Sequence, residues 1–89
     1  MIMKYYPIGT FVVLKNGTWP LMICGRQQIT KKNPAILYDY VGCLYPQGFI
    51  DKDYIVFFQH NDIDKILHKG MASSAETDME KLLHIPETV

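Results

Sequence analysis

The chain has 89 residues, of which 48% are hydrophobic and 20% are charged, and nine basic and nine acidic side chains give a formal net charge of zero. This length suits one small domain, and this composition excludes a wholly disordered chain. A net charge of zero argues against a nucleic-acid or anionic-membrane binder that works through bulk electrostatics, although it leaves a local patch open.

The N-terminal part of the chain has the pattern of a β-hairpin. Residues 10–15, TFVVLK, are rich in β-branched and aromatic side chains and predict a first strand. Asn16 and Gly17 follow, and because both tolerate a positive φ they are a strong hairpin signal. Residues 20–30 predict the return strand, in which Gly25 indicates a bulge or a sharp bend.

Two further strands are expected in the middle of the chain. Residues 35–46 form a third apolar run, and its length together with Gly42 predicts a strand that bends at a barrel corner. Residues 46–48, PQG, turn the chain, and residues 54–58, YIVFF, predict a fourth strand.

After these strands the hydrophobic pattern changes to the period of a helix. Ile63, Ile66 and Leu67 have the i, i+3, i+4 spacing of a helix face. This spacing predicts a helix that begins near Asn61 or Asp62, with Gly70 at the left-handed position after its end.

A second helix is expected near the C-terminus. Ser73 and Glu76 have the spacing of a capping box, and Pro86 would end the helix. Its expected apolar face consists of Met79, Leu82 and Leu83.

Strands first and helices last predict an α+β, β-rich fold. We expect a small, strongly bent antiparallel sheet or SH3-like barrel of four or five strands, followed by one or two C-terminal helices that cover an open edge or end. Within this single domain, residues 1–70 would form the β-rich core with the first helix, and residues 71–89 a C-terminal helical extension.

The sequence shows no targeting segment and no apolar run of the ~20 residues that cross a bilayer, so we expect a cytoplasmic protein with no membrane contact. Cys24 and Cys43 lie in apolar surroundings without a CxxC spacing, and we interpret them as reduced core thiols. A bridge between them would require their strands to pair. Two cysteines and three scattered histidines do not give a metal-ligand spacing, so we expect no metal.

Asp39 lies between two tyrosines in the stretch YDYVGCLYPQG, residues 38–48. Because side chains alternate along a strand, Asp39 points to the same side as Val41 and Cys43, where a carboxylate needs partners. We expect it to accept hydrogen bonds from backbone, from Arg26 or from a tyrosine hydroxyl, and a contact to a partner protein is the alternative.

The aromatic residues are the other candidates for a binding surface. Tyrosine suits half-buried sheet faces and also interfaces, so packing and partner binding both stay open for Tyr38, Tyr40 and Tyr45. Trp19 stands beside the predicted hairpin turn, where an indole has no packing role. We therefore predict Trp19 and the three tyrosines as anchors for a partner, with Asp39 beside them.

No catalytic constellation is visible in the sequence. Asp51-Lys52-Asp53 has the outline of a metal-binding motif but lies in a predicted loop, and His60 and His68 fall at the two ends of the predicted first helix. No glycine-rich phosphate loop is present, and neither cysteine has an activating neighbour. We expect no enzyme, no catalytic residue and no cofactor.

Four segments carry a resemblance to a known family: YYPIGTFVVLKNG, LMICGR, YDYVGCLYPQG and FFQHNDIDKILHKG, in that order. Together they resemble the family called domain of unknown function 4176, short proteins found mostly in Gram-positive bacteria, over roughly residues 5 to 70. Genes of this family tend to lie beside those for LXG-type toxins of the type VII secretion system. The resemblance implies an accessory or targeting role for such a toxin and implies no catalytic residues.

These observations predict a non-enzymatic, chaperone-like adaptor that binds a secreted LXG-type toxin or its small accessory proteins. It would offer a sheet edge or a tyrosine-bearing face. An immunity factor for such a toxin is one alternative. A small SH3-like nucleic-acid-binding or regulatory protein is another, and clustering of Arg26, Lys31 and Lys32 would support it, but we do not expect nucleic acid as a partner. The sequence leaves a homodimer open.

Overall fold

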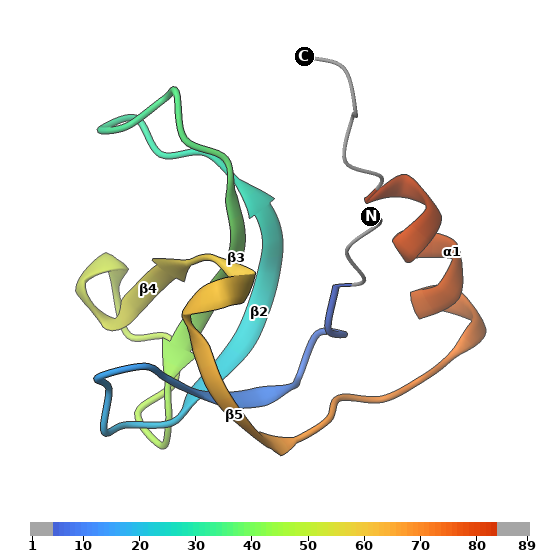
Figure 1. Cartoon of the computed structure of the whole chain (residues 1–89), viewed down its shortest axis with the longest axis horizontal. Coiled ribbons are helices and arrows are strands. Elements are labelled where there is room, and N and C mark those ends of the chain that lie inside the picture. The colour runs from blue at the N-terminus through green and yellow to red at the C-terminus, as the bar shows by residue number, and fades with distance from the viewer. Residues whose placement is uncertain (1–4, 84–89) are drawn as a thin grey trace.

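A computed structural model describes residues 5–83 of the chain (Figure 1). Five antiparallel strands form one sheet in the order β4-β3-β2-β1-β5. Among the described residues a single α-helix follows them, which confirms the expected β-rich α+β class. The elements are β1 (Phe11–Leu14), β2 (Leu21–Gln28), β3 (Tyr38–Leu44), the 3₁₀ turn η1 (Lys52–Tyr54), β4 (Ile55–Phe58), the 3₁₀ turn η2 (His60–Asp62), β5 (Ile63–His68) and α1 (Ser74–Leu82).

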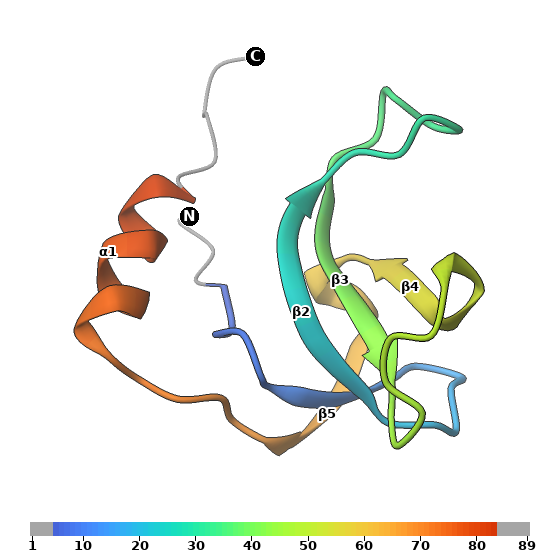
Figure 2. The ribbon, with the colours of Figure 1, turned by 180° about the vertical axis from the view of Figure 1, so that it is seen from behind.

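The sheet has to bend strongly, because its two edge strands are neighbours in sequence. Only residues 59–62 separate the end of β4 from the start of β5. Across a flat sheet these strands would lie about 19 Å apart, which is four spacings of about 4.8 Å. The connection could span at most about 17 Å when fully extended, and η2 shortens it further. Figures 1 and 2 show the result, with β2 and β3 as long curved strands.

The predicted hairpin is present at the start of the sheet. Phe11 pairs with Met22 and Val12 with Leu21. Asn16 adopts a φ of 66°, and the Gly17 N–H donates to the Leu14 carbonyl oxygen over 2.9 Å. The Asn-Gly pair therefore makes the turn that its tolerance of positive φ predicts.

Gly25 marks a bulge in β2, as the sequence predicts. Ile23 pairs with Gly42 and Gly25 with Val41, so Cys24 is an extra residue without a partner in β3. A β-carbon on Gly25 would lie 2.6 Å from a methyl group of Val41, so the close approach of the two strands also requires glycine here.

Residues 63–68 form β5, and the helix expected to begin near Asn61 or Asp62 is not formed. Leu14 pairs with Ile63 and Val12 with Ile66. Val12 and Leu14 are two positions apart in β1, whereas Ile63 and Ile66 are three positions apart in β5. A bulge in β5 supplies the extra residue. It converts the period of two that marks a strand into the three-residue spacing of a helix, and this spacing caused the wrong prediction.

The hydrophobic core lies inside the bend of the sheet. Its buried members come from the N-terminal segment and from β1 to β4, namely Tyr5, Val12, Leu21, Ile23, Tyr40 and Phe58. Gly42 of β3 lies against the Phe58 ring, and a β-carbon on it would approach one ring atom to 3.2 Å. A larger residue would push that ring out of the core.

Helix α1 stands beside the sheet with the N-terminal segment between them, as both views show (Figures 1 and 2). The Ser73 hydroxyl accepts a hydrogen bond from the Glu76 N–H over 3.1 Å, which is the N-cap that the sequence predicts. None of the residues 74–82 is buried, so the expected apolar face is largely absent: Met79 and Leu82 are exposed, and Leu83 alone packs against the core. Pro86 lies outside the described residues.

Candidate functional site

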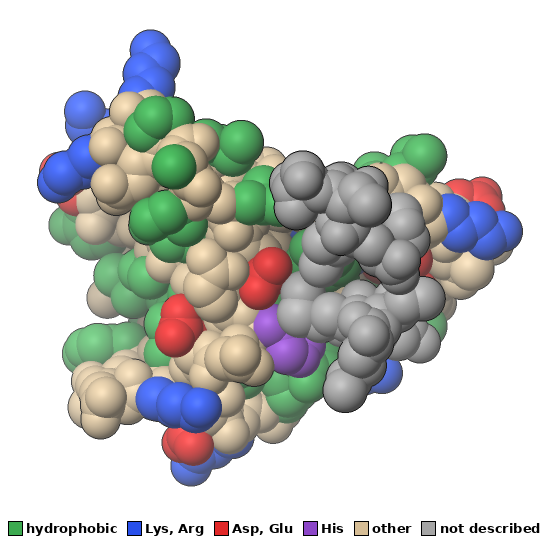
Figure 3. Space-filling view, turned by 45° about the horizontal axis from the view of Figure 1, so that its top comes forward, with side chains coloured by type: hydrophobic (Ala, Val, Ile, Leu, Met, Phe, Trp, Pro, Cys, Tyr) green, Lys and Arg blue, Asp and Glu red, His purple; other side chains and the backbone are tan. Residues whose placement is uncertain are grey.

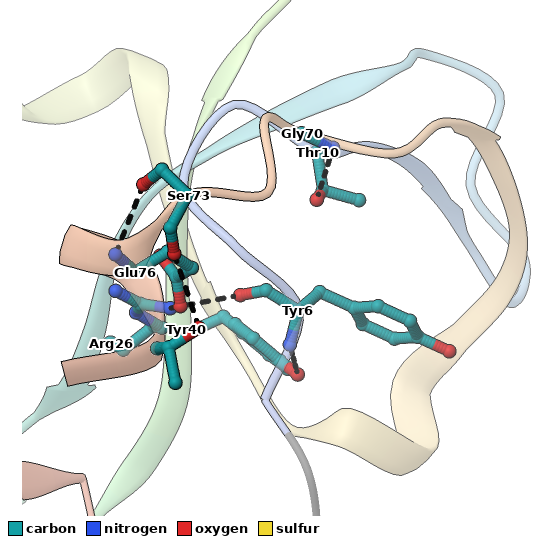
Figure 4. A network of polar contacts seen from close by, with 8 residues as sticks. Tyr6, Thr10, Arg26, Tyr40, Gly70, Ser73 and Glu76 are labelled. Carbon is teal, nitrogen blue, oxygen red and sulfur yellow. Dashed lines mark hydrogen bonds and ion pairs between the residues drawn. The ribbon is translucent and has the colours of Figure 1, made fainter. Parts of the chain in front are cut away.

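The interior of the fold holds a polar network centred on Tyr40. Its side chain is fully buried, and its hydroxyl oxygen accepts a hydrogen bond from the Tyr6 N–H over 3.0 Å (Figure 4). The same oxygen lies 2.8 Å from Nδ1 of His60. Since a tyrosine hydroxyl can both donate and accept, this oxygen can take part in the hydrogen bonds to Tyr6 and to His60 at the same time, and the tautomer of the imidazole decides which atom is the donor in the second one.

His60 is held in place by aromatic stacking as well. Its ring lies parallel to the Tyr6 ring, with centroids 5.1 Å apart and an interplanar angle of 8°. The residue begins η2 rather than lying at the end of an α-helix, and its ring packs against the N-terminal segment.

Asp39 is half-buried and serves the same network. One carboxylate oxygen accepts from the His60 N–H over 2.8 Å, and the other lies 3.5 Å from the Tyr5 hydroxyl, which is a weak contact at that distance. These are the backbone and tyrosine partners expected for this carboxylate. Asp39 therefore anchors η2 to β3.

Burial raises the pKa of Tyr40 and of Tyr5 above the ordinary tyrosine value, and in both cases desolvation is the largest cause. The nearby negative charge of Asp39 acts in the same direction. Both hydroxyls thus titrate further from neutral pH, whereas a general acid or base works best with a pKa near it. The arrangement is suited to holding the fold together.

Arg26 is buried and is bound to α1. Its guanidinium donates to the Glu76 carboxylate over 2.6 Å and to the Tyr6 carbonyl oxygen over 3.3 Å (Figure 4). The side chain is therefore withdrawn from the basic cluster with Lys31 and Lys32 that a nucleic-acid interface would need, because those two lysines are exposed in the loop between β2 and β3.

The other end of the sheet carries a large apolar surface, which we call the loop-end surface. It consists of Trp19, Tyr45, Phe49 and Ile50, whose exposed fractions are 60, 50, 68 and 57%. They come from the β1–β2 loop and the β3–β4 loop, which lie side by side in both views (Figures 1 and 2).

Two contacts fix Tyr45 within the loop-end surface. The Tyr45 N–H donates to the Pro20 carbonyl oxygen over 2.9 Å, which ties one loop to the other beside Trp19. The Tyr45 ring packs edge-on against Phe11 of β1, with centroids 5.0 Å apart. The Tyr45 ring is therefore held against the sheet although half of the residue is exposed. Its side chain has little conformational entropy left to lose when a partner binds.

A second apolar surface lies at the opposite end of the sheet, in the β2–β3 loop. Ile29, Ile36 and Leu37 are exposed there, beside Lys31 and Lys32. Figure 3 shows hydrophobic side chains gathered at this end with basic side chains next to them. Half-buried Tyr38 begins β3 at the same end, and its ring packs against Phe57 of β4 at 5.5 Å.

The structure therefore separates the predicted anchors. Trp19 and Tyr45 lie together in the loop-end surface, Tyr38 lies at the opposite end, and Tyr40 is in the core, out of reach of a partner. The sequence analysis missed Phe49 and Ile50. Their signal was two large apolar residues directly after the turn at 46–48 and outside every predicted strand.

Within residues 5–83, no helix has the length and apolar character needed to span a bilayer, and no three His, Cys, Asp or Glu side chains are grouped to hold a metal ion. No curated protein and no solved structure matches the chain. The family model described as Domain of unknown function (DUF4176) matches residues 5–79. Since this match includes all five strands and more than half of α1, the chain belongs to that family.

Proposed function

We propose that this protein is a non-enzymatic, protein-binding adaptor that accompanies an LXG-type toxin of the type VII secretion system before export from the cytoplasm. The observation that carries the proposal is the loop-end surface, with four large apolar side chains at least half exposed on two loops that are tied together. The secretion context comes from the resemblance of the four sequence segments to their family.

A surface of this kind favours protein binding for a physical reason. Apolar side chains left in water cost roughly 25 cal/mol for every Å² that a partner could cover. Tryptophan and tyrosine are also the residues that most often dominate the energy of an interface. Asp51, Lys52 and Asp53 follow Ile50 directly and are exposed, so they supply the polar rim of mixed charge that commonly surrounds such a centre.

The partner that fits this surface is a protein segment with an apolar face. An amphipathic helix from the N-terminal part of the toxin would cover Trp19 and Phe49 and leave its polar face in water. We therefore propose the targeting end of the toxin as the partner. An immunity factor would bind the toxic end.

The proposal is tested by co-purification. The tagged chain is expressed with its neighbouring genes, and we expect a stoichiometric complex that contains the N-terminal part of the toxin. Trp19→Ala and Tyr45→Ala should each weaken this complex about tenfold or more in a titration with the purified partner. Leu37→Ala removes a comparable exposed side chain at the opposite end of the sheet and should leave the affinity unchanged.

Three results would separate the competing assignments. Capture of the toxic end alone would establish the immunity role. Loss of binding in Leu37→Ala but not in Trp19→Ala would move the interface to the β2–β3 loop. Elution of the tagged chain without a protein partner would overturn the adaptor function.

A further inference from the structure

Cys24 and Cys43 lie on neighbouring strands with their sulfur atoms 3.3 Å apart. Both are free thiols in the structure. Cys43 pairs with Met22 in the sheet, and Cys24 follows Met22 by two positions in β2, so the two cysteines are diagonal neighbours on adjacent strands. The two sulfurs are therefore placed by the backbone of the sheet rather than by flexible loops.

We propose that Cys24 and Cys43 form an oxidative modification site, which a small-molecule disulfide converts into an intrachain disulfide bond within the folded protein. A disulfide requires its sulfurs about 2.05 Å apart, so they must approach by only about a further 1.3 Å. This inference goes beyond the adaptor function and does not depend on it.

The two thiols differ in solvent exposure, and this difference determines which of them reacts first. Cys24 is exposed, whereas Cys43 is 4% exposed and belongs to the buried residues. A reagent in solution therefore reaches Cys24 first. Cys43 lies behind it, close enough to react with the Cys24 sulfur and too deeply buried to meet the reagent.

The chemistry proceeds in two exchanges. Cys24 gives up its proton to solvent, and its sulfur attacks one sulfur of the reagent. The S–S bond of the reagent breaks, and one small thiol leaves with a proton. Cys43 then loses its proton and attacks the Cys24 sulfur, and the second small thiol leaves. Two protein thiols are oxidised, and one small disulfide is reduced to two thiols.

The environment of Cys24 makes the first exchange slow at neutral pH. Although Cys24 is the exposed member of the pair, partial desolvation of its sulfur, followed by its hydrogen bond to Cys43, raises the pKa of Cys24 to about 11. Only about one thiol in ten thousand is then ionised at pH 7, and the thiolate is the form that attacks. The rate of exchange should rise about tenfold from pH 8 to pH 9.

The disulfide would connect β2 and β3 across a separation of 19 residues. Such a cross-link restricts the unfolded chain more than the folded one. In a domain of this size the thermal midpoint should rise by roughly 10–20 °C.

The experiment uses the full chain, reduced, freed of reductant and incubated folded with oxidised glutathione at pH 9. We expect both thiols to disappear from maleimide labelling after denaturation, a loss of two hydrogen atoms in the intact mass, and a higher thermal midpoint. Cys43→Ala should stop at a glutathione adduct on Cys24. Cys24→Ser should gain no adduct while folded, because Cys43 is buried.

Any of three results would overturn the proposal: a wild-type chain that stops at the mixed disulfide, a dimer linked through Cys24, or a disulfide that forms only when urea is present. The wild-type measurement decides the question even if the Cys43→Ala variant does not fold. Loss of the toxin complex would not bear on it, since the disulfide is measured on the isolated chain.

Discussion

Tyr40 shows how one buried residue joins three parts of the chain. Its ring packs against Phe58 and lies edge-on to Tyr5, while its hydroxyl joins the N-terminal segment to η2. A buried hydroxyl without partners would be costly, so the Tyr6 N–H and the His60 ring are needed for this tyrosine to be in the core. Phenylalanine would fill the same volume but would leave the Tyr6 N–H without an acceptor.

Tyr40→Phe should therefore lower the free energy of unfolding by about 1–3 kcal/mol at neutral pH, the usual cost of leaving a buried donor unpaired. Urea denaturation measures this loss. Tyr45→Phe is the matched control, because its exposed hydroxyl is expected to contribute less than about 0.5 kcal/mol. Equal losses in both variants would show that the Tyr40 network does not stabilise the fold.

The same residue predicts a dependence on pH. Since burial raises the pKa of Tyr40, the unfolded chain releases this proton at its ordinary value near 10 while the folded chain still holds it. The stabilisation is fully present below about pH 10 and is lost as the pH rises above that value. Tyr40→Phe should reduce the loss of unfolding free energy at alkaline pH, measured in urea titrations between pH 8 and 11. Part of the loss should remain in this variant, because the pKa values of Tyr5 and Cys24 are also raised.

At the scale of elements, the segment after β5 is fixed by one glycine. The Gly70 N–H donates to the Thr10 hydroxyl oxygen over 2.9 Å (Figure 4), and a β-carbon on Gly70 would overlap the Ile8 carbonyl oxygen. Residue 70 must be glycine because there is no space for a β-carbon. In the helix expected from the sequence, glycine at this position had a different role: it would adopt a left-handed φ after the helix end, where asparagine is also accepted.

Substitutions at Gly70 separate these two reasons. Gly70→Ala and Gly70→Asn should both destabilise the protein by about 1–3 kcal/mol, because each adds a β-carbon against fixed backbone. Met71→Ala, at the exposed neighbouring residue, should change stability by less than about 0.5 kcal/mol. A Gly70→Asn variant as stable as the wild type would favour the helix cap over the close contact. Thermal or urea unfolding of the three variants provides the comparison.

Helix α1 depends on polar contacts rather than on an apolar face. The side chains of Arg26 and Glu76 are 5% and 13% exposed, so removal of the carboxylate leaves a guanidinium charge poorly solvated. The Gln27 side-chain amide, which donates to the Leu83 carbonyl oxygen over 2.9 Å, is a second contact between β2 and the end of the helix.

Glu76→Gln should therefore destabilise the protein by about 2 kcal/mol, because a neutral amide is a weaker acceptor for the Arg26 guanidinium. Asp78→Asn makes the same chemical change at an exposed position of the helix and should have little effect. Hydrogen exchange of the α1 amides would show faster opening in Glu76→Gln alone. Equal exchange in both variants would show that the ion pair does not hold the helix.

At the scale of the whole molecule, local signals in the sequence predicted most of the fold and less of the candidate site. The Asn16-Gly17 turn, the Gly25 bulge and the Ser73 cap depend on residues close in sequence, so they could be recognised. Burial of Arg26 depends on Glu76, which lies 50 residues away, and no local pattern indicates it. The burial of Tyr40 likewise depends on how distant strands pack, whereas the exposure of Trp19 could be predicted from its position beside the hairpin turn.

The sheet order also determines when the fold can be completed as the chain is made. β1 lies between β2 and β5, and Phe11 pairs with both Met22 and His68. The β2–β3–β4 meander can form early from contacts between neighbours in sequence, whereas β1 has a vacant side until residues 63–68 arrive. Pairings this distant in sequence slow folding, commonly to milliseconds or longer. During synthesis the nascent chain therefore exposes an unpaired β1 edge until residues 63–68 have been added.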